Sequence, residues 1–187
     1  MTQPRSFPSD LCLESPRLQL RPMRHADAAQ WLAIMADPQV MRYWHHAPWQ
    51  NLAEAESALA ADRQAYANGE LLKLGMYRRD NGELIGMVQL FNIDDISRRG
   101  EIGYCLASSV QGRGYMDEAL TCFIDYLAHT LHMRRLEGEI DPRNQGSART
   151  LERQGFVLEG TLRARWCVAG ELSDSGLYGL LLEPPVA

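Results

Sequence analysis

Along this chain the spacing of apolar residues changes several times, and each change marks a new element of secondary structure. Apolar residues recur every three to four positions in some stretches, as on one face of a helix, and alternate with polar residues in others, as in a half-buried strand. The helical spacing predicts helices over residues 28–36, 52–68, 114–131 and 147–154. The alternation predicts strands over residues 18–22, 71–79, 83–91, 99–106, 135–140, 156–168 and 171–182.

Turn and capping residues between these stretches support their boundaries. Asp37-Pro38 stops the first helix, because a residue that precedes proline disfavours the helical conformation. Asn68-Gly69 and Gly155 follow the second and fourth helices, as glycine commonly does. Asp80-Asn81-Gly82 separates two alternating stretches and predicts a β-hairpin. Asp27 is placed to cap or to charge the start of the first helix.

This order of elements predicts a mixed α/β protein of the α+β type. We expect a largely antiparallel, twisted sheet of about seven strands with helices on both faces. The strand–helix–strand stretch over residues 99–140 supplies one parallel pair, because a crossover helix returns the chain in the same direction. A length of 187 residues fits one domain, which we place at residues 14–187 after an N-terminal extension of residues 1–13.

Composition and charge exclude several classes of protein. Apolar residues make up 45% of the chain and charged residues 23%, which excludes a disordered, collagen-like or coiled-coil chain. The 19 basic and 24 acidic residues give a net charge of -5, and no basic stripe marks a nucleic-acid binder. No apolar stretch approaches the ~20 residues that span a bilayer, and residues 1–10 lack the apolar core of a signal peptide. We therefore expect a cytoplasmic protein without membrane contact.

Four cysteines are spread along the chain without the spacing of a metal or redox motif. Cys12, Cys105, Cys122 and Cys167 share no C-x-x-C pattern and lie in apolar contexts. In a reducing compartment we expect free, buried thiols instead of a disulfide framework. The sequence therefore predicts no metal site.

The most informative segment joins the strand over residues 99–106 to the helix over residues 114–131. Gly112 and Gly114 let the backbone of this short loop approach a ligand closely and adopt positive φ. The helix that follows offers about four N–H groups without intrahelical partners, which with Arg113 suits a pyrophosphate. A plain strand-to-helix turn is the alternative. The segment lacks both the G-x-x-x-x-G-K-[ST] and the G-x-G-x-x-G pattern, which disfavours nucleotide hydrolysis and nicotinamide chemistry.

The segment Gln111-Gly112-Arg113-Gly114-Tyr115-Met116 resembles the phosphate loop of the GCN5-related N-acetyltransferase (GNAT) superfamily. That loop reads Q/R-x-x-G-x-G/A, and this chain departs from it at Met116, whose backbone N–H remains available. Further similarities run over roughly residues 14–183 and resemble the RimJ/RimL type of ribosomal-protein alanine acetyltransferases. They lie at Glu14–Pro22, Asp37–Trp44, Glu101–Tyr104, Asn144–Ser147 and Gly155–Gly160.

The resemblance implies a GNAT fold and transfer of an acetyl group from acetyl-CoA to a primary amine, without a metal. The acceptor would be a protein N-terminal α-amine or a small amine, and the protein a monomer or homodimer. In the family a backbone N–H near Cys105 to Ala107 stabilises the thioester oxygen. The residues implied to bind the cofactor are Leu106, Ala107, Val110, Gln111, Gly112, Arg113, Gly114, Tyr115, Met116, Asn144 and Ser147.

An amine must lose a proton before it attacks a thioester. An α-amino group has a pKa of ~7.7–8.0 and a lysine ~10.4, so a general base helps the first and is nearly essential for the second. Glu101 and Glu139 lie on strands where relatives place such a carboxylate, and we favour Glu101. Glu137 shares a face with Glu139 and is a third candidate. Each is otherwise a solvated or salt-bridged strand residue.

The departing thiolate of CoA needs a hydrogen-bond donor or a proton. Many relatives place a tyrosine seven residues after the position of Asn144, where this chain has Leu151. In the RimL-like branch a serine can take this role, and Ser147 matches its position. Alternatively, Ser147 only supports the first turn of its helix.

The acceptor pocket is implied to form from the first third of the chain. We assign Trp31, Trp44 and Tyr104 to substrate binding, although core packing explains the tryptophans equally. For Arg163, Arg165 and Trp166, on the last hairpin, we expect a solvated strand face, and the alternative is that they shape the acceptor site. The alternative to an enzyme is a non-catalytic, regulatory domain that binds acyl-CoA, in which the acid–base residues have lost their role.

Overall fold

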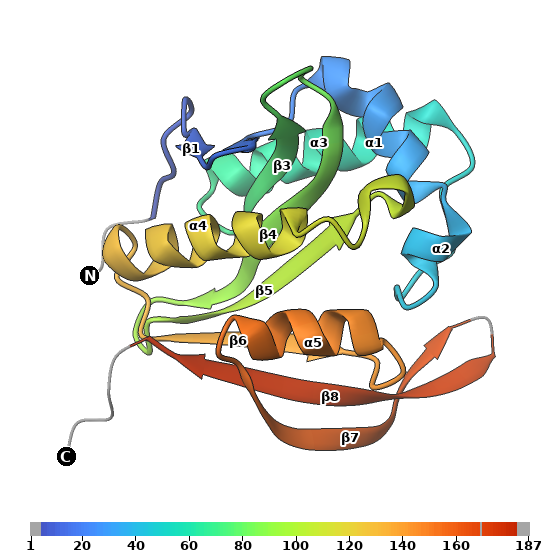
Figure 1. Cartoon of the computed structure of the whole chain (residues 1–187), viewed down its shortest axis with the longest axis vertical. Coiled ribbons are helices and arrows are strands. Elements are labelled where there is room, and N and C mark those ends of the chain that lie inside the picture. Colours follow the sequence, from blue (N-terminus) through green and yellow to red (C-terminus); the bar gives the residue numbers. More distant parts are fainter. Residues whose placement is uncertain (1–4, 169, 183–187) are drawn as a thin grey trace.

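The computed structural model describes residues 5–168 and 170–182, and Figure 1 shows their arrangement. The strands are β1 (Leu13–Glu14), β2 (Leu18–Arg21), β3 (Leu72–Arg78), β4 (Leu84–Asp94), β5 (Arg99–Leu106), β6 (Arg135–Ile140), β7 (Val157–Val168) and β8 (Glu171–Leu181). The helices are α1 (Ala28–Met35), α2 (Pro38–Met41), α3 (Leu52–Ala67), α4 (Tyr115–His129) and α5 (Gln145–Arg153). Two short 3-10 helices are η1 (His25–Asp27) and η2 (Ser108–Val110).

The strands form one mixed sheet. Within the described residues its eight strands stand in the order β1-β2-β3-β4-β5-β6-β8-β7. Every neighbouring pair is antiparallel except β5 and β6, which are parallel. This confirms the predicted fold class and the predicted parallel pair. The sheet has one strand more than predicted, because β1 has only two residues and leaves no alternating pattern in the sequence.

The parallel pair is short, and this shapes the site. Only Arg99–Glu101 of β5 pairs with Arg135–Glu137 of β6, although both strands continue beyond these residues. Figure 1 shows β5 and β6 diverging from their paired ends toward the region where α5 and the loop before α4 lie. The sheet therefore opens between its two halves, at the C-terminal ends of two parallel strands.

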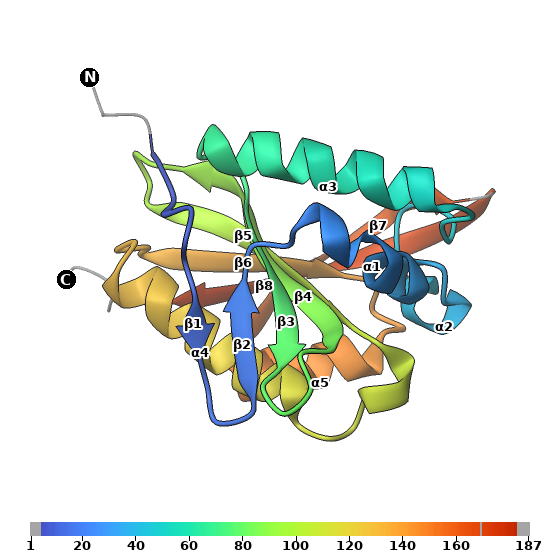
Figure 2. The same cartoon turned by 90° about the horizontal axis from the view of Figure 1, so that it is seen from above.

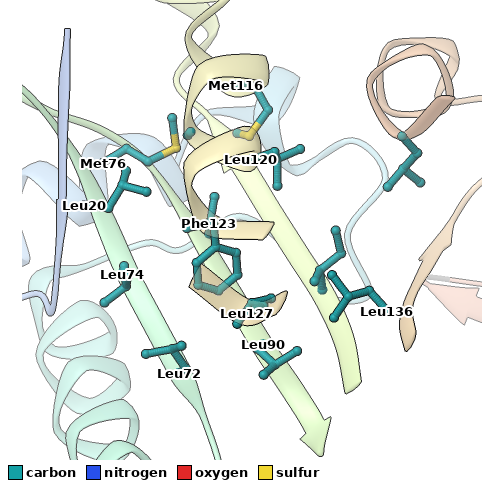
Figure 3. Packing of buried hydrophobic residues seen from close by; sticks show 14 of the residues in the cluster. Leu20, Leu72, Leu74, Met76, Leu90, Met116, Leu120, Phe123, Leu127 and Leu136 are labelled. Carbon is teal, nitrogen blue, oxygen red and sulfur yellow. The ribbon is translucent and has the colours of Figure 1, made fainter. Parts of the chain in front are cut away.

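Helices cover both faces of the sheet, as predicted. Figure 2 shows α3 on one side of the sheet and α4 and α5 on the other. On the second side, Met116, Leu120, Phe123 and Leu127 of α4 form a buried stripe that packs on the strands (Figure 3). No helix among the described residues has the length and apolar character needed to cross a membrane.

A second core lies on the other face, beneath α1 and α3. Trp31 and Leu59 pack there with Tyr77 and Met87 of the sheet. Asp27, which we expected to cap or to charge the start of α1, stands at the N-cap position but makes no side-chain cap of that helix. It is buried instead, and its Oδ2 accepts hydrogen bonds from the Tyr77 hydroxyl at 2.6 Å and from the N–H of Arg24 at 2.7 Å.

The N-terminal segment packs against the domain. Phe7 is buried in the core of the α4 face, and the Tyr66 hydroxyl donates to the carbonyl of Pro8 at 2.6 Å. The expected boundary between residues 13 and 14 falls inside β1. Residues 1–4 of that extension and residues 183–187 of the expected domain lie outside the described residues.

The thiols are free, but the expectation that they are buried is wrong for most of them. Cys105 is buried, Cys122 is partly buried, and Cys12 and Cys167 are exposed. Burial raises the pKa of Cys105 to about 12, so this thiol stays protonated and behaves as an apolar side chain. The apolar context of Cys167 misled the prediction, because β7 lies at the edge of the sheet.

Candidate active site

A cleft of about 860 Å³ opens where the second half of β5 meets α4, α5 and the segment after α1. Three parts of the chain, far apart in the sequence, contribute to its wall. The lining residues are Gln39, Val40, Tyr43, Trp44, Tyr104, Cys105, Leu106, Gln111, Gly112, Gly114, Tyr115, Met116, Asp117, Arg143, Asn144, Gln145, Gly146, Ser147, Arg149, Thr150 and Arg153.

The loop before α4 gives this cleft a wall made of backbone. Gly112 and Gly114 have φ angles of 74° and 76°, in the left-handed region that favours glycine. A Cβ on Gly112 would meet no atom within 4 Å, so the loop leaves open space there. The N–H of Glu118 donates to the carbonyl of Gly114 at 3.2 Å, and the three residues before Glu118 have no intrahelical acceptor for their N–H groups. These N–H groups and the helix dipole form an anion site.

Cationic side chains stand on the opposite wall of the cleft. Arg143, Arg149 and Arg153 come from α5 and the loop before it. Arg153 pairs with Asp117 at 2.9 Å, which ties α5 to the first turn of α4. Arg143 is likewise paired, with Asp141 at 2.6 Å and with Glu171. The backbone donors on one wall and the guanidinium of Arg149 on the other suit a diphosphate.

Arg17 supports the loop, although it was not among the residues predicted from the sequence. Its Nη1 donates to the carbonyl of Arg113 at 3.0 Å, and its Nε donates to Glu118 at 2.6 Å. Its guanidinium also lies 4.4 Å from the centre of the Tyr115 ring. These contacts fasten both ends of the loop-to-helix turn. No local pattern could have indicated this role, because Arg17 lies almost 100 residues from its partners.

The start of α5 brings two predicted residues to the cleft. The Oδ1 of Asn144 accepts the N–H of Ser147 at 3.1 Å and so caps the helix. The carbonyl of Ser147 accepts the Tyr104 hydroxyl at 3.2 Å. Burial raises the pKa of Tyr104, which therefore stays protonated as a donor. Both of these Ser147 contacts use its backbone.

Glu101 lies on the other face of the sheet, which we call the carboxylate face because Glu137 and Glu139 share it. Ile102 and Tyr104 pack on the α4 side, so the alternation along β5 turns Glu101 away from it. Its carboxylate accepts a hydrogen bond from Nδ2 of Asn92 at 2.9 Å. Burial raises the pKa of Glu101, the Asn92 bond opposes this, and the two neighbouring carboxylates reinforce it. A raised pKa makes a carboxylate a better base near neutral pH.

The other two carboxylates have stronger partners. Glu137 accepts from Arg99 at 3.0 Å and from Arg135 at 2.8 Å, so its charge is neutralised. Oε1 of Glu139 accepts from Nε1 of Trp166 at 2.7 Å and from the Ser175 hydroxyl at 2.5 Å. Of the three candidate bases, Glu101 is the one without an arginine or an indole on its carboxylate among the bonds described.

Most of the residues expected to bind the cofactor line the cleft. These are Leu106, Gln111, Gly112, Gly114, Tyr115, Met116, Asn144 and Ser147. Val110 is buried in the core, and its N–H already donates to the carbonyl of Ala107 at 3.1 Å. Arg113 is exposed and turns back to donate to the carbonyl of Ser109 at 3.2 Å. We therefore do not assign Val110 and Arg113 a contact through their side chains.

The residues expected to bind the substrate divide in the same way. Trp44 and Tyr104 line the cleft. Trp31 has no exposed surface and packs edge-on against Trp49, which favours the alternative of core packing. Trp166 is partly buried and hydrogen-bonded, which corrects the expectation of a solvated side chain there.

A larger hollow of about 970 Å³ lies elsewhere, between the N-terminal segment, β2 and α3. Two of its cationic side chains are already paired, Lys73 with Asp62 at 2.8 Å and Arg21 with Asp27 at 3.4 Å. It contains none of the residues that were predicted to bind cofactor or acceptor or to act as base. We therefore place the site at the smaller cleft beside α4.

Comparison with known proteins agrees with this placement. The family model described as Acetyltransferase (GNAT) domain matches residues 17–157. The uncharacterized N-acetyltransferase p20 of Bacillus licheniformis is 30% identical over 169 residues, which cover 90% of this chain and 95% of that protein. The ribosomal protein uS5-alanine N-acetyltransferase of Escherichia coli is 28% identical over 142 residues, or 71% of this chain and 73% of that protein.

A solved structure resembles the whole arrangement. RimJ of Mycobacterium smegmatis, in complex with CoA-disulfide, superposes with a TM-score of 0.81 at 26% sequence identity. The match covers 91% of this chain and 85% of that one. The chain is therefore similar in sequence and in fold to N-acetyltransferases.

Proposed function

Because the chain belongs to the GNAT family of N-acetyltransferases, we propose that it transfers the acetyl group of acetyl-CoA to a primary amine. The amine would be a protein N-terminal α-amine or that of a small molecule. One observation carries the proposal: an anion-binding cleft and a half-buried carboxylate meet where β5 and β6 part, from opposite faces of the sheet.

The residues of the cleft fit the diphosphate and pantetheine of CoA. Gly112 leaves open space at the loop, and the first turn of α4 offers free N–H groups beside it. Arg149 would help to neutralise the phosphates, and Asn144 and Ser147 would lie beside the pantetheine. The cofactor supplies the acetyl group as a thioester, and the amine displaces CoA as a thiol.

Glu101 is the proposed general base. Its Oε2 is held by Asn92, and burial shifts its pKa toward that of the amine that it must deprotonate. The backbone N–H groups near Cys105 would stabilise the negative charge that develops on the acetyl oxygen. The hydroxyl of Ser147 would donate to the departing sulfur, a role that relatives give to a tyrosine where this chain has Leu151.

The proposal is tested by the release of free thiol from acetyl-CoA. The panel of acceptors contains peptides with different first residues, the same peptides with blocked amino termini, and small di- and polyamines. We expect turnover with at least one free amine and none above hydrolysis with the blocked peptides. Tight CoA binding without transfer to any acceptor would contradict the enzyme and support an acyl-CoA-binding regulatory domain instead.

A further inference from the structure

β7 contains a bulge that changes the direction of its side chains. Leu162 pairs with Ser175 and Trp166 pairs with Ser173, so residues 163–165 face Asp174 alone. Oδ1 of Asp174 accepts the N–H of Ala164 at 2.8 Å, and Ala164 has a positive φ of 48°. Bulges of this kind re-aim the residue that follows them. Here that residue is Trp166.

The bulge brings Trp166 onto the carboxylate face, where its indole is held at its polar edge. Nε1 donates to Glu139 at 2.7 Å and lies 3.3 Å from the hydroxyl of Ser175. Ser175 is 1% exposed and itself donates to the same oxygen of Glu139. Two donors on one carboxylate oxygen fix both the indole and the carboxylate. Glu139 is therefore a positioning residue for Trp166, which explains why its carboxylate is not left open as a base.

The flat face of Trp166 is held as well, from a distant part of the chain. His45, in the segment between α2 and α3, stacks on it with 3.7 Å between ring centres and 20° between ring planes. In both views the end of β7 and the start of β8 lie near this segment (Figures 1 and 2). Burial lowers the pKa of His45, although Glu139 opposes this, so the ring is mainly neutral at pH 7 and the stack does not depend on its charge.

This pair of rings contacts the same face of the sheet as the proposed base, through Glu139. Glu139 contacts Trp166, and its charge is felt by Glu101 on the neighbouring strand of the same face. Because the Trp166 indole is held both at its polar edge and on its flat face, it cannot move aside for a bulky side chain.

We propose that Trp166 and His45 form a rigid wall of the acceptor channel, which sets how large the group next to the reacting amine can be. The wall favours amino termini whose first residue is small and rejects those whose first residue is bulky. This inference deepens the proposed transfer to an amine and rests on it.

The test uses two peptides that differ only in their first residue, alanine or leucine, and compares kcat/KM for the two. In Trp166→Ala we expect the leucine-to-alanine ratio of kcat/KM to rise about tenfold, within the range that a few methylene groups in a pocket provide. His45→Ala opens the same wall from the other side and should shift the ratio in the same direction. Leu172→Ala is the matched control, because Leu172 is an exposed apolar residue of the same hairpin, and should leave the ratio unchanged.

A second readout does not need turnover. Dissociation constants of the two peptides for the CoA-loaded protein should show the same shift in Trp166→Ala. An unchanged ratio in both readouts, in variants with a wild-type melting temperature, would overturn the proposal that Trp166 and His45 limit the size of the first residue. If the wild type acetylates neither peptide, the proposed acceptor fails, while the binding ratio still decides whether Trp166 limits size. If Trp166→Ala does not fold, the same two ratios measured in His45→Ala support or overturn the wall.

Discussion

The two faces of the sheet contribute different kinds of groups to the candidate site. On the α4 face, the cleft is formed largely by backbone, with two glycines and the open N–H groups of a helix. The carboxylate face is built from side chains, and Glu101, Glu139 and Trp166 come from three strands. A backbone site suits a cofactor shared by a whole family, because many side chains leave it intact. A side-chain site can differ between relatives, which suits the choice of acceptor.

The difference also concerns how each face is held together. The loop on the α4 face is fixed by Arg17, whose contacts to Arg113 and Glu118 hold the turn without entering the cleft. On the carboxylate face, the group that we expect to react and the groups that hold it are neighbours. We therefore expect substitutions on the α4 face to change cofactor affinity and substitutions on the carboxylate face to change rate or acceptor choice.

The largest effect should come from Glu101→Gln, which keeps the size of the side chain and an acceptor for Asn92 but removes the base. We expect kcat/KM for the acceptor to fall about 100-fold or more, while the dissociation constant of CoA stays unchanged. Steady-state kinetics and calorimetric titration measure the two quantities. Glu137→Gln is the control, since two arginines already neutralise that carboxylate. Equal losses in both variants would contradict the assignment.

Gly112→Val should act on the cofactor. Its φ of 74° makes a side chain strained, and the new side chain would enter the open space at the loop. Gly82→Val is a close match, because Gly82 has a φ of 71° and equally open surroundings in the β3–β4 turn. Both should lose about 1–2 kcal/mol of stability through backbone strain. We expect CoA affinity to fall about tenfold or more for Gly112→Val alone, and a similar fall for Gly82→Val would show that strain is the cause.

Ser147→Ala should lower kcat by about 100-fold, the lower end of the range for a lost proton donor. The melting temperature should stay unchanged, because the contacts of Ser147 with Asn144 and Tyr104 use its N–H and carbonyl. Asn144→Ala should instead lose about 1 kcal/mol of stability, as a removed helix cap does. Should Ser147→Ala leave kcat intact, its hydroxyl plays no part in the departure of the thiol.

Ser108→Ala should give the smallest effect, at a contact that joins the loop after β5 to α2. The Ser108 hydroxyl donates to Asp37 at 2.5 Å and is the main reason why the pKa of Asp37 lies below its usual value. A lowered folded-state pKa stabilises the protein above the unfolded value of ~3.9, and this is lost as the pH falls through the folded pKa. We therefore expect Ser108→Ala to lose about 1 kcal/mol at pH 7 and progressively less below pH ~3.9.

Thermal unfolding at several pH values measures this difference. Ser109→Ala is the control, because Ser109 is the exposed neighbour of Ser108. A loss for Ser108→Ala that is equally large at pH 7 and pH 3 would mean that the charge of Asp37 is not involved.

Much of the fold follows from local patterns. The long alternating strands and the stripe of α4 bury apolar surface with a fixed period, so both their type and their partners were predictable. β1 and α2 were not predicted, because β1 has two residues and α2 four, too few to show a period. Both exist because they pack against the rest of the chain.

The residues of the candidate site also differ in how far local sequence could place them. Gly112 and Gly114 were predictable, since a positive φ and a close approach need glycine wherever the loop occurs. Neither Trp31 nor Trp166 could be placed in this way: the first is sealed in a core and the second is turned inward by a bulge. Their positions depend on contacts between distant segments, and no spacing along the chain encodes such contacts.

The central claim is that Glu101 removes the proton of an amine whose cofactor is held from the other face. The most direct measurement is the pH dependence of kcat/KM for a peptide with a free amino terminus, in the wild type and in Glu101→Gln. In the wild type the acid limb should follow Glu101, whose pKa is raised by burial. In Glu101→Gln the rate should depend on the free amine and rise tenfold per pH unit up to ~7.7–8.0. Superimposable profiles would contradict the account.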